Sequence, residues 1–316
     1  MSDLPGERGF ALVAAVWLLV VLSIVSLEFS LRAREQHLAA ANAIEEERAR
    51  AAALGGLEHA RARLGRMLAE KPERAGSAPA EWLDPWRHAD TVLTQPTALD
   101  DVRYRLRIRD VGARLNLNLA SEAELRRFFV ALEVDAAQAD EIAQSVLDWR
   151  DPDDFRRGRG AERDYYLRRG GAVLPRNAPF ASLADLGFVR GMTREVLERA
   201  TPHLTLAGTG QVNLATADRA VLLALPGMSE EAVGLLLRRR AQGLSASLFD
   251  LAPQLSAGAR AALQAAMPEL FPRTTEETRE VEGWSEGWVE GSRVRVRLRA
   301  LFVRGDLVGA PFPTAG

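Results

Sequence analysis

The sequence contains no cysteine among its 316 residues. This absence excludes disulfide bonds, thiolate catalysis and cysteine-based zinc sites, and it leaves the redox compartment of the protein undetermined. An excess of one charge is lacking as well, because 41 basic residues are balanced by 43 acidic residues and the net charge is −2. Near-neutrality of this kind gives no electrostatic argument for nucleic acid as the main partner.

Catalytic signatures are also missing. The four histidines are scattered along the chain, and there is no G-x-S-x-G motif, P-loop or dinucleotide-binding fingerprint. The short stretch Gly208-Thr209-Gly210 is too brief a signal for a phosphate site. We therefore expect that the protein is not an enzyme. A signal-anchored periplasmic enzyme is kept as an alternative, which a pocket of perturbed carboxylates would support.

Charge is absent from Phe10 to Leu27, and this apolar run lies close to the N-terminus. A helix over these residues would be about 27 Å long, which is enough for the core of a bilayer. The run is longer than the apolar part of a secretory signal peptide, and no clean cleavage site follows it. We interpret residues 10–27 as a retained transmembrane helix, with a removed signal peptide or a buried core helix as alternatives.

Proline is absent between Pro5 and Pro72, so nothing interrupts the helix beyond the membrane. Residues 28–68 are rich in Ala, Leu, Arg and Glu, all of which favour helix. We predict one helix of about 55 residues, with a bend at Gly55 and Gly56 as a possibility. Its outer half is amphipathic and needs a surface to pack on.

Alternating residues predict strands on both sides of the middle of the chain. Apolar residues at 102, 104, 106 and 108 alternate with arginines at 103, 105, 107 and 109. A short strand is expected after the turn at Gly112, and another strand over residues 293–303. The glycine-rich residues 283–292 are expected to form turns before it. We interpret the arginine face as solvent cover, with a polyanion site as the alternative.

The middle of the chain has a helical pattern and an internal echo. Residues 118–121 (NLAS) resemble residues 213–216 (NLAT), and each stretch precedes a helical hairpin. Ser121 and Thr216 are placed to cap the helices that follow, and Glu124 completes a capping box with Ser121. The simplest interpretation is two helical hairpins that bury their apolar faces on each other.

The second hairpin resembles the helix-hairpin-helix module of DNA-binding proteins, which holds phosphate with backbone N–H groups at a glycine-containing turn. Its turn is Pro226-Gly227-Met228-Ser229, but Glu230 and Glu231 follow at once and would repel phosphate. The first hairpin has Glu133-Val134-Asp135 at its turn and no glycine. We expect a structural or protein-binding domain. A membrane-anchored, competence-like DNA-binding protein is the alternative.

A turn-rich segment between the hairpins, residues 148–171, collects acidic side chains: Asp148, Asp151, Asp153, Asp154, Glu162 and Asp164. Closely spaced carboxylates in a loop suit a hard cation such as Ca²⁺, which takes about six to eight oxygen ligands. The spacing is not that of an EF-hand. Salt bridges are the alternative, because many arginines lie in the same segment, and Arg150 is positioned to compete with a metal ion.

The residues around position 10 resemble the type IV pilin and type II secretion pseudopilin class. The resemblance consists of a short polar leader, a Gly9-Phe10 junction, an apolar run and an unbroken helical stalk. It implies that a prepilin peptidase cuts after Gly9 and that the new amino terminus, Phe10, is methylated. Most members have glutamate at the fifth mature position, but Ala14 stands there in this chain.

Within that class the chain resembles the minor pseudopilin K family, which lacks this glutamate and is placed at the filament tip. The resemblance covers nearly the whole chain and implies an α+β fold. In this fold a long N-terminal helix packs on a small antiparallel sheet, and a large all-α domain with two hairpin units is inserted. The implied segments are a leader (1–9), transmembrane helix (10–27), stalk (28–68), first pilin-like part (69–119), α-helical insertion (120–272) and C-terminal strands (273–316).

The resemblance also implies a function and a metal. The protein is expected to cap the periplasmic pseudopilus with the I and J subunits, on the major pseudopilin filament, and to assist export of folded proteins across the outer membrane. It would be a single-pass inner-membrane protein with a periplasmic globular part and no nucleic-acid partner. The family's acidic loop binds calcium, which makes these residues candidate ligands: Asp148, Asp151, Asp153, Glu162 and Asp164.

Overall fold

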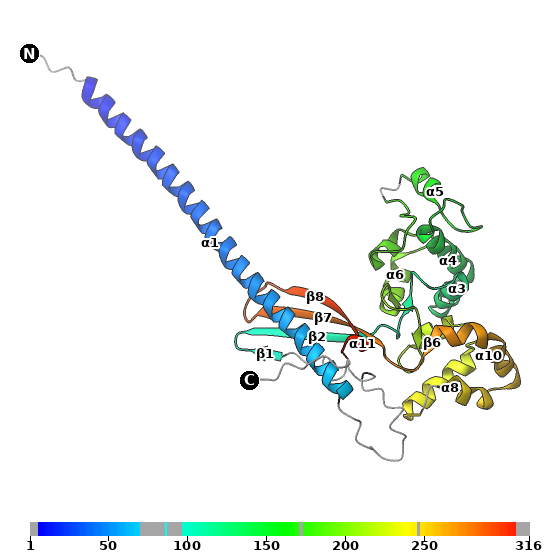
Figure 1. Ribbon diagram of the computed structural model, residues 1–316. Coiled ribbons are helices and arrows are strands. Elements are labelled where there is room, and N and C mark those ends of the chain that lie inside the picture. Colours follow the sequence, from blue (N-terminus) through cyan, green and yellow to red (C-terminus); the bar gives the residue numbers. More distant parts are fainter. Residues whose placement is uncertain (1–5, 70–85, 87–96, 171–172, 245–246, 308–316) are drawn as a thin grey trace, which may run out of the picture. The chain divides into compact units, whose positions relative to one another are not determined.

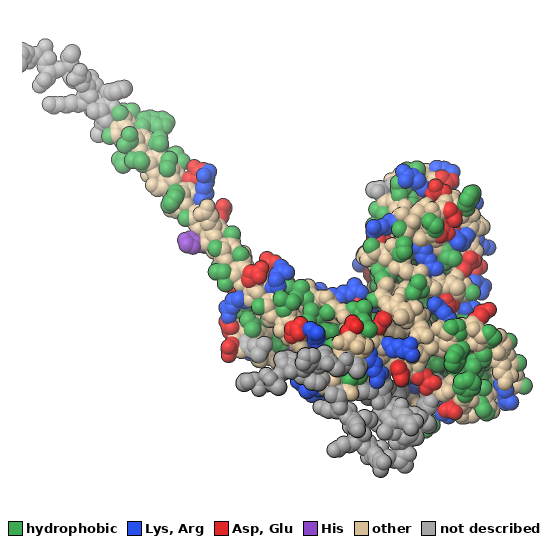
Figure 2. Space-filling model, in the orientation of Figure 1, with side chains coloured by type: hydrophobic (Ala, Val, Ile, Leu, Met, Phe, Trp, Pro, Cys, Tyr) green, Lys and Arg blue, Asp and Glu red, His purple; other side chains and the backbone are tan. Residues whose placement is uncertain are grey.

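A computed structural model describes residues 6–69, 86, 97–170, 173–244 and 247–307. Helix α1 runs without a break from Gly6 to Ala69, through the glycine pair at 55 and 56 (Figure 1). An 18-residue stretch near its N-terminal end is apolar enough to cross a membrane, and none of that stretch is buried within the described protein. Figure 2 shows hydrophobic side chains over this part of the helix. The first five residues of the predicted leader (1–9) lie outside the described residues, and the rest of it belongs to α1.

The chain forms two compact units. The first consists of residues 1–57, 95–106 and 285–298, and the second of residues 58–94, 107–284 and 299–316. A four-stranded sheet has the order β1-β2-β7-β8, and β1 pairs antiparallel with β2. Its strands are β1 (Thr97–Leu99), β2 (Val102–Asp110), β7 (Glu280–Val289) and β8 (Val296–Val303). The α+β class is therefore confirmed.

Strand β2 agrees with the predicted alternation. Tyr104, Leu106 and Ile108 are buried, whereas Arg105, Arg107 and Arg109 are exposed. The next strand, β3 (Leu115–Asn116), follows Gly112 as expected, but it pairs with β4 (Leu204–Thr205) in a separate small sheet. Between them, the backbone N–H of Val111 donates to the carbonyl oxygen of Glu280 at 2.9 Å. The chain therefore leaves the sheet at 111 and returns to it beside the same point, at 280.

The predicted turns over residues 283–292 are wrong for most of that stretch, because residues up to Val289 belong to β7. The glycines that suggested turns have a packing role instead. A Cβ on Gly287 would lie 2.1 Å from the carbonyl oxygen of Ala49 and 2.5 Å from the backbone nitrogen of Ala53, both in α1. Glycine is needed because the strand approaches the helix backbone directly. The turn itself is confined to the residues around Gly291, whose φ is 81°.

Most helices of the second unit lie in an insertion between β2 and β7, and the predicted helical segment lies within this insertion. They are α3 (Glu122–Ala131), α4 (Ala136–Arg150), α5 (Arg163–Arg168), α6 (Arg194–Ala200), α7 (Arg219–Ala224), α8 (Glu230–Ala241), α9 (Leu248–Leu251) and α10 (Ala257–Leu270). Short 3₁₀ helices are η2 (Leu183–Phe188), η3 (Thr201–His203), η4 (Ala252–Gln254) and η5 (Phe271–Arg273). Helix α11 (Arg304–Leu307) follows β8.

Each helical unit also contains a pair of parallel strands, each two residues long. Strand β3 pairs with β4 (Leu204–Thr205), and β5 (Val212–Asn213) pairs with β6 (Thr274–Thr275). Asn116 and Asn213 stand at equivalent positions, because each side-chain oxygen accepts from the backbone N–H two residues later. Each backbone carbonyl also accepts from the N–H groups three and four residues later. Each asparagine thus starts one helical unit.

This equivalence corrects the predicted repeat by two residues. Asn213 corresponds to Asn116 rather than Asn118, so the N-cap Ser121 corresponds to Asp218. The Ser121–Glu124 capping box is confirmed. Thr216 is not a cap, because its hydroxyl donates to Asp110, 2.6 Å away. The Asn-Leu pair occurs at both registers of the first unit, but Ala follows it only at 118–120, which is why the sequence alone gave the wrong alignment.

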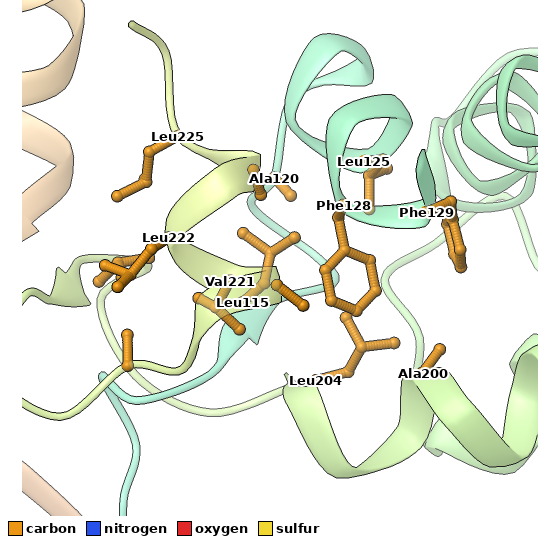
Figure 3. Close-up of a cluster of buried hydrophobic side chains, with 14 of the residues drawn as sticks. Leu115, Ala120, Leu125, Phe128, Phe129, Ala200, Leu204, Val221, Leu222 and Leu225 are labelled. Atoms are coloured by element: carbon orange, nitrogen blue, oxygen red, sulfur yellow. The ribbon is translucent and has the colours of Figure 1, made fainter. Parts of the chain in front are cut away.

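The core of the helical insertion lies where α3 contacts α4 and α7. Figure 3 shows Phe128 and Leu125 of α3 beside Val221 of α7 and Leu204 of β4. All four side chains are buried within one continuous apolar cluster. A second aromatic group, in which Trp149 stacks on Phe180 at 6.0 Å, extends this cluster towards the end of α4. The acidic segment therefore begins at a helix end that is packed into the apolar core.

Replacing Gly287 with alanine tests the contact between β7 and α1. We expect Gly287→Ala to lower the free energy of unfolding by about 3 kcal/mol, because the added methyl group must displace backbone. Gly55→Ala is the matched control: no atom lies within 4 Å of its added Cβ, and the helix should gain up to about 1 kcal/mol. Urea unfolding of the full chain in a non-ionic detergent, followed by tryptophan fluorescence, measures both. Equal midpoints for the two variants would contradict the packing described.

Candidate metal centre

Three carboxylates of the acidic segment meet at the junction between α4 and α5. Asp151 is the C-terminal cap residue of α4, Glu162 precedes the first residue of α5, and Asp153 lies in the loop between them. One oxygen from each of these carboxylates lies within 4.8 Å of the others. The helix ends bring together side chains that are up to 11 positions apart in the sequence.

Glu162 is the centre of this cluster. Its residue is only 2% exposed, and within the described part of the chain neither side-chain oxygen has a hydrogen-bond partner. The Oδ1 atom of Asp151 is also buried without a partner among the described residues. Buried polar atoms are nearly always satisfied, so these oxygens need a ligand, a proton or water. An oxygen-rich group of this kind matches the ligand preference of Ca²⁺.

Asp148 lies next to the cluster and shares Arg157 with it. The guanidinium donates to Asp148 Oδ1 at 2.7 Å and to Asp151 Oδ2 at 2.5 Å. The backbone N–H of Arg157 also donates to Asp148. Gly160 is required beside this carboxylate, because a Cβ there would lie 2.0 Å from Asp148 Oδ2. Arg157 is therefore the cation that balances the acids.

Arg150 and Asp164 have other roles than the sequence suggested. Arg150 was expected to compete with a metal ion, but its guanidinium donates to the carbonyl oxygens of Leu117 and Ala120. Asp164 is largely exposed and pairs with Arg168 at 2.7 Å. Of the five predicted ligands, the structure groups Asp151, Asp153 and Glu162, places Asp148 beside them, and leaves Asp164 outside the group.

The electrostatics of the site reflect burial together with repulsion between acids. Burial, followed by the charges of Asp148, Asp151 and Asp154, raises the pKa of Glu162 to about 7. Burial also raises the pKa of Asp148, although hydrogen bonds from Arg157 oppose the shift. A divalent cation would remove the repulsion that raises these values. The residues present therefore fit a calcium ion.

The turn of the second hairpin is occupied by contacts within the domain. Gly227 has a φ of 72°, and a Cβ there would lie 2.5 Å from the Cβ of Ala266, so the glycine serves the packing of α10. The following acids are engaged within the domain: Glu230 pairs with Arg219, and Glu231 accepts from the N–H and hydroxyl of Ser256. This arrangement agrees with a structural hairpin.

The processing residues lie in α1. Gly9 and Phe10 fall within the helix, and Ala14, at the expected glutamate position, is exposed. Further along, the apolar side chains of Leu38 and Ile44 are more than half exposed as well. The described structure therefore gives α1 an apolar surface well beyond the segment needed to cross a membrane.

Comparisons with known proteins agree with this architecture. Residues 104–209 match the family model described as type II secretion system (T2SS), protein K. The protein of that name from Pseudomonas aeruginosa is 27% identical over 244 residues, which cover 72% of each chain. The one from Klebsiella pneumoniae is 25% identical over 260 residues, covering 76% of this chain and 77% of the relative.

A solved structure has the same fold. It is described as the crystal structure of the GspK-GspI-GspJ complex from the enterotoxigenic Escherichia coli type 2 secretion system. The TM-score is 0.58 at 19% identity, over 86% of this chain and 94% of that chain.

The long helix on a small sheet, with its uncovered apolar end, defines a pilin-like protein that carries a membrane-anchoring segment. The helical insertion and the protein K match over residues 104–209 narrow the class further. Over most of its length the chain is similar to type II secretion system protein K.

The raised pKa of Glu162 predicts a pH dependence of stability when metal is removed. Folding shifts this pKa from 4.5 to about 7, so the folded protein binds more protons than the unfolded chain between these values. Stability in a chelator should therefore fall as the pH rises from about 5 to about 8. Glu162→Gln cannot ionise and should lose this part of the pH dependence.

Thermal unfolding of the full chain in EDTA, followed by circular dichroism, provides the measurement. Asp164→Asn is the control, because this exposed carboxylate lies outside the cluster. If Glu162→Gln follows the same curve of melting temperature against pH as the unaltered protein, the assignment of the raised pKa is wrong.

Proposed function

We propose that this protein is a minor pseudopilin of the type II secretion system, which caps the tip of the periplasmic pseudopilus and assists the export of folded proteins across the outer membrane. The observation that carries the proposal is the large helical insertion between β2 and β7 of a pilin-like sheet. A domain of this size adds bulk that a subunit repeated along a filament would have to accommodate at every step. A terminal subunit meets that demand only once.

The N-terminal residues support the same position in the filament. Cleavage after Gly9 would make Phe10 the methylated amino terminus, and Ala14 would be the fifth mature residue. A glutamate at that position would need a positive partner in the lipid, such as the amino terminus of a neighbouring subunit. A subunit with alanine has no such requirement. It can enter an assembly without a subunit ahead of it.

The partners we propose are the I and J minor pseudopilins, because GspI and GspJ are the proteins that form the solved complex with GspK. The exposed apolar residues of α1, including Leu38, Ile44 and Leu54, offer a helical surface for them. The major pseudopilin filament would lie below this group, and the prepilin peptidase would act on the precursor. We place the anchor in the inner membrane and the globular part in the periplasm.

We further propose that Asp151, Asp153 and Glu162 hold a calcium ion, with Asp148 behind them. The buried oxygens without partners support this assignment, and so does the oxygen-only donor set. When bound, calcium would supply positive charge that joins the end of α4 to the start of α5. The protein's own part is to keep the carboxylates together: Arg157 pairs with Asp148 and Asp151, and the ends of α4 and α5 place Asp151 and Glu162. The role is structural, and no catalytic step is assigned.

Mass spectrometry of the mature amino terminus tests the processing step. We expect a chain that begins at methylated Phe10. Gly9→Arg should block cleavage and leave the leader attached, because the peptidase would require the small residue at its cut site. Gly6→Arg is the control within the leader and should be processed. An intact Met1 in the unaltered protein, or a cut beyond Leu27, would remove it from the class of processed pseudopilins.

Calcium binding has its own test. Isothermal titration of the EDTA-treated full chain with calcium chloride should show one site. Asp151→Asn and Glu162→Gln should each weaken binding about tenfold or more, because each removes a charged ligand. Asp164→Asn should bind like the unaltered protein. Equal losses for all three variants would show a diffuse charge effect, and no heat in the unaltered protein would refute the site.

A further inference from the structure

Strand β7 carries a tandem Glu-Gly-Trp motif, first at Glu282-Gly283-Trp284 and again at Glu286-Gly287-Trp288. Alternation along a strand places both tryptophans on one face and the glycines on the other. Each indole is bracketed by arginines. The two sites therefore share one arrangement, an indole beside two arginines, and can be compared.

In the first site, a carboxylate of the same chain pairs with both arginines. The guanidinium carbons of Arg114 and Arg299 lie 5.5 Å and 6.0 Å from the ring centre of Trp284. Glu282, which is almost fully buried, accepts from Arg114 at 2.6 Å and also pairs with Arg299. Both arginines of this site thus share one internal carboxylate.

The second site lacks that carboxylate. Arg105 and Arg295 lie 6.0 Å and 4.9 Å from the ring centre of Trp288. The two acids that flank this tryptophan on β7 and in the turn after it are already engaged. Glu286 accepts from Arg297 at 2.8 Å, and Glu290 accepts from Arg103 at 2.6 Å.

Within the described part of the chain, Arg295 donates to the backbone carbonyl oxygens of Ser292 and Val294. Among the residues that the structure describes, no carboxylate pairs with Arg105 or Arg295. Both side chains belong to exposed residues. Two cations with their N–H groups accessible are therefore held at a fixed place by one aromatic ring.

The chemistry of this site favours carboxylate over nucleic acid. A guanidinium that lies over an indole keeps the N–H groups at its edge, and their fork matches a carboxylate. Single-stranded nucleic acid would instead need a free aromatic face for base stacking. Two guanidiniums already lie over the Trp288 ring.

We propose that Arg105, Trp288 and Arg295 form a docking site for an acidic segment of a partner protein. A carboxylate of the partner takes the place that Glu282 occupies in the first site. The proposal is independent of the calcium site and of the place of this subunit in the filament. It adds a surface on the sheet to the helical surface of α1.

The test uses the full chain in a non-ionic detergent and a fluorescein-labelled hexaglutamate peptide, followed by fluorescence anisotropy at low salt. Hexaglutamine is the uncharged comparison and should not bind. Arg105→Gln and Arg295→Gln should each weaken hexaglutamate binding about tenfold, because each removes a charge-assisted hydrogen-bonding group. Arg105→Lys keeps the charge but loses the fork, and should still weaken binding about threefold.

Arg194→Gln is the matched control, because it removes an exposed arginine that pairs with Glu198 on α6. It changes the net charge equally and should leave the affinity within about twofold. Unchanged circular dichroism spectra establish that the variants fold. The proposal is overturned if hexaglutamine binds as well as hexaglutamate, if the control loses as much affinity as Arg295→Gln, or if hexathymidylate binds more tightly than the peptide.

Discussion

The close contact between β7 and α1 is the constraint on which the pilin-like part of the structure depends. Gly287 meets a patch of α1 formed by Ala49, Ala52 and Ala53, all of which are buried. Because neither side carries a bulky side chain, backbone atoms set the distance between strand and helix. The same helix carries the apolar segment towards its N-terminus, so a membrane anchor and a sheet share one rigid support. Dispersion over many such close contacts stabilises the pair.

At the acidic junction of α4 and α5, charge and burial matter more than close contact between backbones. There the chain buries Asp148 and Glu162 among other acids that repel them, and Arg157 pairs with Asp148 and Asp151. The raised pKa of Glu162 is the cost of this arrangement in the absence of a cation. Local packing from Trp149 and Phe180 keeps the group assembled in spite of the repulsion. Such a site is organised by the apolar core behind it rather than by the charges within it.

Much of this fold could be predicted from the sequence, and the failures have physical reasons. The proline-free stalk, the alternating β2 and the Ser121 capping box depend on local patterns, and all three were predicted. Strand β7 was missed because glycines that serve close packing look the same in sequence as glycines that serve turns. Asp151, Asp153 and Glu162 were among the predicted ligands, but the sequence could not show that Arg157 rather than Arg150 faces them. That distinction depends on the direction of side chains at the end of α4, which tertiary packing decides.

The hydrogen bond between Val111 and Glu280 has a consequence for how such proteins can change over evolutionary time. The helical insertion begins and ends at neighbouring residues of the sheet, so it is attached to the sheet at one place. The length of the insertion has little effect on the strain in β2 and β7, because these strands lie side by side whether the insertion is long or short. During evolution the helical insertion can therefore become longer, shorter or differently folded, while α1 and the sheet on which it packs are selected separately.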